Sequence, residues 1–355
     1  MPPDTSNAGL WPYLIDPRHA PPATEEWRRL TALADRLAML TSPQLTAHLL
    51  AAFPELLAGR RLTADRQSAN RLMTRFFRQR ALQWVSRIAA LEIEVVYMKG
   101  LATALTLYPD PDLRNMSDID LLVREADLAR FVKAMTAAGF TFRRSRNHAW
   151  GLIGDASFKP LVSPDGHTNF DIHVYPDNFP THLGLSTEEV FAASRPVETG
   201  RVELRVPAPD HTLLIALMNV VRDKFHPGAI NSLIDAILLI REPPAPDWDG
   251  IIARAEKGGF VKGLAAAVTL FAALGMPDGK LPPALIREYR GPARLVFDAT
   301  RQEFARMFPR KPRLIHELLR EVLLCAEPRT VWWKNYRRIS GLVQPRRGEP
   351  VMPAR

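Results

Sequence analysis

The sequence contains a single cysteine, Cys325, among its 355 residues. One thiol cannot form an intramolecular disulfide or a cysteine-rich zinc site, which fits a protein of a reducing compartment. Long apolar runs are also missing, because the longest helix-like one, residues 263–276, is shorter than the roughly 20 residues that a membrane span requires. Residues 1–7 show neither the basic start nor the apolar stretch of a secretory signal. We therefore expect a cytoplasmic protein with no membrane span, in which apolar neighbours bury Cys325 in a helix.

Several common catalytic motifs are absent as well. Residues 275–281 resemble a phosphate-binding P-loop, but they are one residue short and end in Leu rather than Ser or Thr. The sequence has no Gly-x-Gly-x-x-Gly fingerprint, no His-Glu-x-x-His zinc motif and no Gly-x-Ser-x-Gly nucleophile elbow. P-loop hydrolases, dinucleotide-binding dehydrogenases, zinc peptidases of that type and serine hydrolases are therefore not indicated.

The net charge of +9 is unevenly spread along the chain. Residues 294–355 hold 14 Lys and Arg against 6 Asp and Glu, so the remainder is nearly neutral. The aromatic and basic run of residues 332–338 has the composition of a polyanion-binding segment. The simpler interpretation is a solvated helix end whose Trp side chains pack on the core, so a nucleic acid is a less favoured partner.

Hydrophobic periodicity divides the chain into helical and β-rich regions. It predicts an α+β fold, in which a small mixed β-sheet core is flanked by N-terminal and C-terminal helical segments. The predicted divisions are a proline-rich extension (1–23), a helical subdomain (24–92), the α+β core (93–208), a helical domain (209–325) and a basic tail (326–355). Predicted strands are residues 95–98, 119–123, 140–142, 158–162, 169–175 and 201–206. Predicted helices are residues 101–107, 125–138, 210–223, 229–240, 248–257, 263–274 and 283–308.

Two aspartates interrupt an otherwise apolar strand pattern. Asp118 and Asp120 alternate with the apolar residues of segment 119–123. Because successive strand residues point to opposite faces, both carboxylates share a face, with Cα atoms roughly 6.5–7 Å apart. Two neighbouring like charges are costly to bury unless a cation compensates them, and carboxylate oxygens suit Mg²⁺ or Mn²⁺. The pattern therefore predicts a divalent metal site.

The predicted strand 169–175 offers a third carboxylate, Asp171, and a histidine, His173, which alternate with apolar residues. If this strand lies beside the first, Asp118, Asp120 and Asp171 can hold two cations about 3.5–4 Å apart. Such a pair of cations can activate an acceptor hydroxyl and clamp a triphosphate while pyrophosphate leaves. His173 shares the polar face, either as an accessory site residue or as a histidine satisfied by hydrogen bonds in the core.

The turn after the first predicted strand has the features of a phosphate site. Lys99 and Gly100 lead directly into a predicted helix. Glycine permits close backbone approach, and a helix N-terminus presents free N–H groups to an anion. Lys99 adds a point charge, while Arg114 and Ser117 stand just before the aspartate pair and can add phosphate contacts. A solvated Lys99, and an Arg114 that only caps its own loop, are the alternatives.

These motifs together resemble a known group of enzymes. Met-Lys-Gly-Leu-Ala (98–102), Leu-Tyr-Pro-Asp-Pro (107–111), the run 114–123 and Asp-Ile-His (171–173) are similar to the nucleotidyltransferase superfamily of the DNA polymerase β type. More narrowly, they resemble the bacterial family known as uncharacterised nucleotidyltransferases, most strongly over residues 95–174. The resemblance implies that Asp118, Asp120 and Asp171 bind Mg²⁺ or Mn²⁺ and that Gly100 holds nucleotide phosphates.

Two features depart from the superfamily pattern. The turn glycine is usually followed by Gly or Ser, whereas Gly100 is followed by Leu101. The segment between Gly100 and Asp118 is also lengthened by residues 108–113. Both departures leave the three aspartates in place, but they allow an altered donor or an inactive enzyme.

The resemblance implies a metal-dependent enzyme that moves a nucleoside monophosphate from an NTP such as ATP to an unidentified acceptor, a small molecule or a peptide, with release of pyrophosphate. One alternative is a catalytically silent protein that senses nucleotide or binds a partner. Another is a nucleic-acid-acting transferase or binder. Four further residues are candidates for an acceptor pocket, although ordinary surface and core roles are favoured for them: His211, Lys224, His226 and Asp235.

Overall fold

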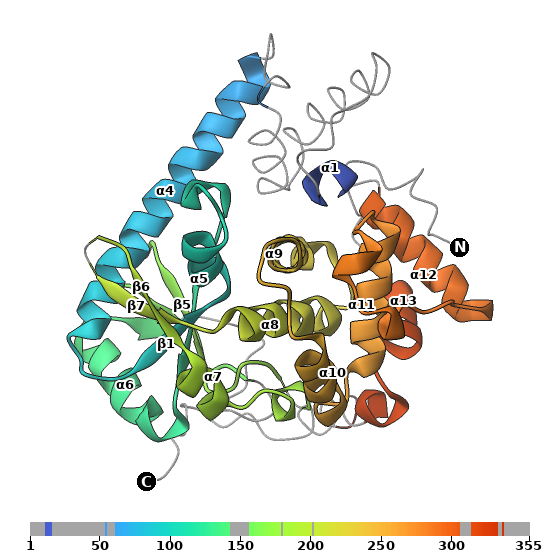
Figure 1. The fold of residues 1–355 in the computed structure, drawn as a ribbon. Coiled ribbons are helices and arrows are strands. Elements are labelled where there is room, and N and C mark those ends of the chain that lie inside the picture. The colour runs from blue at the N-terminus through green and yellow to red at the C-terminus, as the bar shows by residue number, and fades with distance from the viewer. Residues whose placement is uncertain are drawn as a thin grey trace. The chain divides into compact units, whose positions relative to one another are not determined.

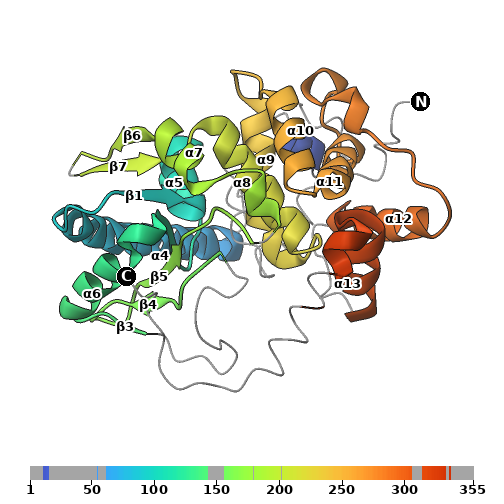
Figure 2. The ribbon, with the colours of Figure 1, turned by 90° about the horizontal axis from the view of Figure 1, so that it is seen from below.

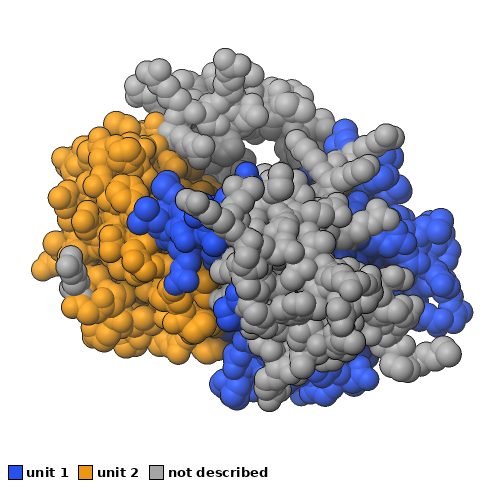
Figure 3. Space-filling model, turned by 90° about the horizontal axis from the view of Figure 1, so that it is seen from above, with its two compact units in different colours: residues 1–73, 216–250, 260–327 blue, residues 74–215, 251–259, 328–355 orange. Residues whose placement is uncertain are grey.

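The structure, a computed structural model, describes residues 11–15, 54, 61–142, 156–178, 180–200, 202–305, 314–332 and 336. Most of the predicted proline-rich extension and the end of the predicted basic tail therefore lie outside the described residues. The chain divides into two compact units, which Figure 3 colours separately. Unit 1 comprises residues 1–73, 216–250 and 260–327, and unit 2 comprises residues 74–215, 251–259 and 328–355.

The described part of unit 2 is built on one mixed sheet of seven strands (Figure 1). Its order is β3-β4-β5-β2-β1-β7-β6, with β2 parallel to β5, β1 parallel to β7 and the other neighbours antiparallel. The apolar, β-branched runs of β1 and β2 form the buried centre, where such residues pack well. The strands are β1 (Val95–Met98), β2 (Ile119–Val123), β3 (Thr141–Phe142), β4 (Leu161–Val162), β5 (Asn169–His173), β6 (Arg195–Glu198) and β7 (Glu203–Val206).

Three helices supply the helical part of the core of unit 2: α4 (Arg61–Ala89), α5 (Lys99–Thr106) and α6 (Glu125–Ala137). Figures 1 and 2 show α4 and α6 lying against the sheet. Trp84 of α4 and Phe131 of α6 join Leu121 and Phe170 of the sheet in one apolar cluster. Because strand residues alternate, this cluster takes one face of β2 and β5 and leaves the other face for their polar side chains.

Unit 2 also contains a short helix and an edge strand that the sequence patterns do not predict. Helix α7 (Thr187–Ala193) begins with a capping box in which Ser186 and Glu189 bond reciprocally to each other's backbone N–H groups. Strand β6 pairs antiparallel with β7, although it contains a proline and is largely exposed. An edge position tolerates proline because one side of the strand makes no ladder bonds.

The remaining α-helices lie wholly or partly in unit 1. Helices α8 (Pro209–Arg222) and α10 (Trp248–Lys257) have residues in both units. The aromatic ring of Trp11 packs against Phe304, and its indole N–H donates to the Phe304 carbonyl at 2.6 Å. The other elements of unit 1 are α1 (Trp11–Ile15), η4 (Pro227–Ala229), α9 (Ile230–Arg241), α11 (Val261–Ala273), η5 (Asp278–Lys280), η6 (Pro283–Leu285), α12 (Gly291–Ala305), α13 (Leu314–Arg320) and the π-helical turn η7 (Glu321–Cys325).

The predicted fold class is confirmed: the chain is an α+β protein with one mixed sheet flanked by helices. The single helix predicted over residues 283–308 is wrong, because a short 3₁₀ turn ends at Leu285 and α12 starts only at Gly291. Gly291 has φ of 55° and precedes a proline, so the chain turns there before a new helix starts. Cys325 is buried, as predicted. Among the described residues, the helices are all too short or too polar to cross a membrane.

Candidate metal and nucleotide site

The site is formed by the register of two parallel strands at the centre of the sheet. Asp120 of β2 lies directly beside Asp171 of β5, and Leu122 lies beside His173. The two acidic strands therefore lie side by side, as the predicted three-carboxylate site requires. Since side chains two residues apart share a face, Asp120, Asp171 and His173 all project from the same side of the sheet.

The opposite face of the same strands holds this register. Ile119, Leu121, Phe170 and Ile172 are fully buried in the apolar cluster that includes α4, α5 and α6. A slip of one residue would turn these four side chains away from the core and bring the carboxylates into it. Burial of the apolar face thus fixes which residues form the site.

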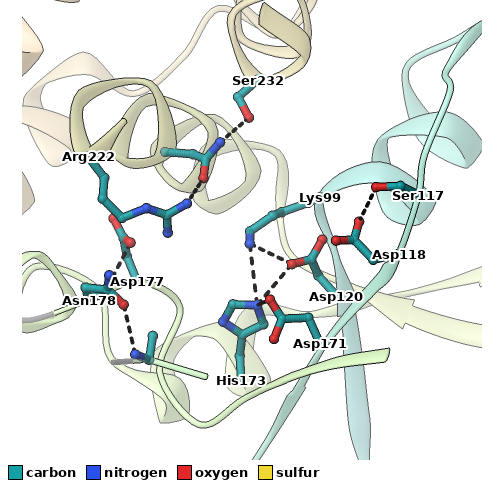
Figure 4. A network of polar contacts seen from close by, with 12 residues as sticks. Lys99, Ser117, Asp118, Asp120, Asp171, His173, Asp177, Asn178, Arg222 and Ser232 are labelled. Atoms are coloured by element: carbon teal, nitrogen blue, oxygen red, sulfur yellow. Dashed lines mark hydrogen bonds and ion pairs between the residues drawn. The ribbon is translucent and has the colours of Figure 1, made fainter. Parts of the chain in front are cut away.

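Asp120 is the most buried of the site carboxylates, with 8% of its side chain exposed. Its Oδ1 accepts a hydrogen bond from Lys99 Nζ at 2.6 Å and lies 3.0 Å from His173 Nε2. Figure 4 shows these side chains pointing toward one another. Burial alone would raise the pKa of Asp120, but the Lys99 ammonium and His173 outweigh it and hold that pKa well below its usual range. Asp120 is therefore ionised.

His173 is buried between the two paired carboxylates. Its Nε2 lies 3.0 Å from Asp120 Oδ1 and 3.4 Å from Asp171 Oδ2. Burial and the Lys99 ammonium lower the pKa of His173, but the hydrogen bonds to Asp120 and Asp171 outweigh them, so this pKa is raised overall. Burial raises the pKa of Asp171, but the hydrogen bond and the charge of His173 outweigh it and lower this pKa overall.

The donor set of this cluster suits a divalent cation. One ligand atom each from Asp120, Asp171 and His173 lies within 4.8 Å of the other two. Asp171 Oδ1 and His173 Nδ1 are buried and make no hydrogen bond to the described residues. Two carboxylates and an imidazole are ligands that Mn²⁺ and related divalent ions accept, and a bound cation would compensate the buried charge.

Asp118 and Ser117 lie beside this cluster and not within it. Asp118 precedes β2, its side chain is exposed, and its carboxylate accepts a hydrogen bond from Ser117 Oγ at 3.4 Å. Partial desolvation and the charges of Asp120 and Asp171 raise the pKa of Asp118, whereas the Lys99 charge opposes this rise. The charge of Asp118 is thus coupled to the cluster. The ligand atoms that lie within 4.8 Å of one another, however, belong to Asp120, Asp171 and His173 and not to Asp118.

The turn between β1 and α5 adopts an unusual backbone. Lys99 has φ of 47°, in the left-handed region that non-glycine residues seldom occupy. Gly100 is buried, and a Cβ added there would lie 3.0 Å from Met116 Cβ and 3.8 Å from Arg114 Nη1. Arg114 is itself buried and donates to the Asn115 carbonyl at 2.5 Å. Gly100 is therefore required at least for packing.

The four residues predicted as candidates for an acceptor pocket are divided between the two units. His211 belongs to unit 2, where burial and then the nearby Arg254 charge lower its pKa. Lys224, His226 and Asp235 belong to unit 1. Lys224 forms an ion pair with Glu321 at 3.1 Å, His226 Nδ1 accepts from the Gly228 N–H, and Asp235 is buried in α9.

From the sequence, His173 is predicted only as an accessory residue of the site, and Lys99 is predicted to contact nucleotide phosphates. The signal for His173 was its position two residues after Asp171 on the same strand face. The contact between Lys99 and Asp120 had no local signal, because it depends on the left-handed backbone of Lys99 and on the antiparallel pairing of Met98 with Asp120.

Comparison with known proteins gives one family match and one structural neighbour. The chain matches no curated protein. It is similar to the crystal structure of an antigenic nucleotidyltransferase-like protein from Paracoccidioides brasiliensis, with 15% sequence identity, a TM-score of 0.33, and coverage of 52% of this chain and 86% of that chain. Residues 23–275 match a family described as uncharacterised nucleotidyltransferase. Since that match spans most of the sequence, the chain belongs to the uncharacterised nucleotidyltransferase family.

Proposed function

We propose that this protein is a metal-dependent nucleotidyltransferase that moves a nucleoside monophosphate from an NTP to an unidentified small-molecule or peptide acceptor. The observation that carries the proposal is the convergence of Asp120, Asp171 and His173 on one face of the central strands. A purely structural ion pair would not need two carboxylates and an imidazole within one ligand sphere. The family match supports the same class of reaction.

Asp120 and Asp171 would hold the divalent cation, with His173 and Asp118 as further ligands. When bound, Mg²⁺ or Mn²⁺ would supply Lewis-acid activation of the acceptor hydroxyl and neutralisation of triphosphate charge. Asp171 would help to take the proton of the acceptor, and its Oδ1, buried without a hydrogen-bond partner among the described residues, supports this role. The acceptor oxygen would form the new bond to the α-phosphorus, and the bond to the pyrophosphate leaving group would break.

The triphosphate would bind along the turn that precedes the aspartates. Gly100 lies beside the Arg114 guanidinium, and Ser117 exposes its hydroxyl next to Asp118. A guanidinium provides paired N–H donors for phosphate oxygens, and glycine allows the backbone to approach them. Lys99 is the further cation proposed for this turn.

A catalytically silent protein on the same fold is the second candidate. It is favoured by the Lys99–Asp120 ion pair, which occupies a carboxylate that catalysis would need, and by Leu101 in place of the usual small residue. Nucleotide binding without nucleotide consumption would identify this candidate. A nucleic-acid substrate remains a prediction from the basic C-terminal region, and a steep salt dependence of oligonucleotide affinity would support it.

The decisive experiment measures pyrophosphate release from each NTP with Mg²⁺ or Mn²⁺ and a small-molecule and peptide extract, followed by mass spectrometry of the products. The wild type should release pyrophosphate and yield a product heavier by one nucleoside monophosphate. Asp120→Asn should abolish both signals, whereas Asp249→Asn, which changes an exposed carboxylate of α10, should leave them unchanged. Full turnover by Asp120→Asn would contradict the assignment of the site.

A further inference from the structure

The Lys99 ammonium lies within the ligand cluster and not on the surface of the phosphate turn. Its Nζ is 2.6 Å from Asp120 Oδ1 and 3.4 Å from His173 Nε2, and only 18% of its side chain is exposed. Asp120 Oδ1 is also the oxygen nearest to His173. The cation of Lys99 therefore contacts two of the three groups that would hold a metal.

The backbone of the turn directs Lys99 to this position. Met98, the last residue of β1, pairs with Asp120 across the sheet, so the next residue starts beside that carboxylate. A non-glycine residue at φ of 47° is strained, and such strain persists where the surroundings enforce it. The ion pair between the Lys99 ammonium and the Asp120 carboxylate is an attractive contact at this turn that offsets the backbone strain.

The charge of Lys99 acts on every carboxylate of the site. It stabilises the ionised forms of Asp118, Asp120 and Asp171 alike. These groups and His173 are the titratable side chains that face one another in this cluster among the described residues. Lys99 thus supplies the positive charge that a divalent cation would otherwise supply to the same oxygens.

We propose that Lys99 is a built-in counter-cation of the metal site, which competes with the divalent metal for Asp120 and sets the metal affinity of the protein. This inference rests on the metal site of the proposed function. Mg²⁺ bound to a carboxylate oxygen lies about 2.0–2.1 Å from it. An ammonium 2.6 Å from the same Oδ1 would repel that metal at close range, so a metal bound to Oδ1 would require Lys99 to move away.

Displacement gives Lys99 a second role in the same turn. Once it leaves Asp120, its ammonium is available to phosphate oxygens at the N-terminus of α5, where the sequence motif places a triphosphate. The lysine would hold the ligand carboxylates together before the metal arrives and would contact the nucleotide afterwards.

The test is direct titration of Mn²⁺, followed by electron paramagnetic resonance of the free ion, without nucleotide. Lys99→Gln removes the charge but keeps an N–H donor for Asp120, and Lys99→Arg keeps the charge. Lys133→Gln, at an exposed position on α6, is the matched control. Lys99→Gln should bind Mn²⁺ about tenfold more tightly or better, as expected when a competing unit charge leaves a partly buried site. Lys99→Arg and Lys133→Gln should show no such gain.

The outcomes separate this inference from the proposed function. If the wild type binds Mn²⁺ and Lys99→Gln binds it no more tightly, the counter-cation role is wrong and the metal site stands. If no variant binds Mn²⁺, both proposals fall. Should Lys99→Gln be unfolded without metal by circular dichroism, the counter-cation role requires that Mn²⁺ restore the folded signal, and failure to do so overturns it.

Discussion

Asp112 is an almost fully buried carboxylate in the turn that leads to the acidic strand. It lies in η2 (Pro111–Leu113), with 2% of its side chain exposed. Its two oxygens accept hydrogen bonds from Arg75 Nε at 2.6 Å and Arg78 Nη2 at 2.8 Å, both from α4. The segment between Gly100 and Asp118 is therefore fastened to the long helix, and we predict that Asp112→Asn loosens it.

The structure gives the size of the expected effect. Hydrogen bonds to charged groups contribute about 1.5–3 kcal/mol each, and removal of one partner of a buried ion pair costs about 3–5 kcal/mol. The Arg75 side chain is 53% exposed, so solvent screens its pair with Asp112 and this pair contributes the smaller part of the effect. Arg78 is only 18% exposed and carries most of the effect. Asparagine retains one acceptor oxygen, so we expect Asp112→Asn to cost about 2–3 kcal/mol.

Urea unfolding followed by circular dichroism at 222 nm measures this cost. Arg75→Gln is the matched control, which should cost clearly less than Asp112→Asn because the Arg75 charge is already hydrated. Burial raises the pKa of Asp112, but Arg78 and Arg75 outweigh it and lower the pKa overall. The advantage of the wild type should thus be complete at neutral pH and fade as the pH falls below the usual aspartate range. Equal stability of wild type and Asp112→Asn at pH 7 would refute the reasoning.

Three further predictions concern single groups. Tyr97→Phe should leave stability unchanged or raise it by about 1 kcal/mol in urea unfolding, because the buried hydroxyl has no hydrogen-bond partner among the described residues. In metal-free buffer, Asp118→Asn should raise the melting temperature by relief of like charge, whereas Asp120→Asn should lower it because the half-buried Lys99 ammonium loses its partner. The reverse order would contradict the site. Burial raises the pKa of Glu189, but the hydrogen bonds of the α7 cap and the Arg254 charge outweigh it and lower the pKa to about 2. The wild type should therefore be more stable than Glu189→Gln above pH 4.5. Thermal melts should show this advantage disappear as the pH falls from 4.5 to 2.

The sequence predicts the centre of unit 2 well because its signals there are local. Strands β1 and β2 have the predicted bounds, since short apolar β-branched runs between turn residues have few alternatives. Helix α10 also has the predicted bounds, residues 248–257. Strand alternation alone places His173 on the face of Asp171, and the parallel register of β5 with β2 brings that face beside Asp120.

Other elements depend on contacts that periodicity cannot report. Strand β6 is polar and contains Pro196, so it exists as a strand because β7 pairs with it. Helix α7 was missed although Ser186 and Glu189 form a capping box that the sequence does display. The predicted helix over residues 283–308 failed because apolar spacing continues across a turn that Gly291 and its proline neighbour impose.

The three aspartates of the motif are not equivalent, although the sequence presents them as a uniform triad. Asp120 and Asp171 are held ionised by Lys99 and His173, whereas partial desolvation and then the charges of Asp120 and Asp171 raise the pKa of Asp118. Groups whose surroundings push their pKa values apart commonly divide their roles. Asp120 and Asp171 are therefore suited to be permanent ligands, and Asp118 is suited to join them when a divalent charge offsets the repulsion. Lys99 gives the larger stabilisation of ionised Asp120, whereas His173 gives the larger stabilisation of ionised Asp171. The ionisation of these two carboxylates therefore depends on Lys99 and His173 together.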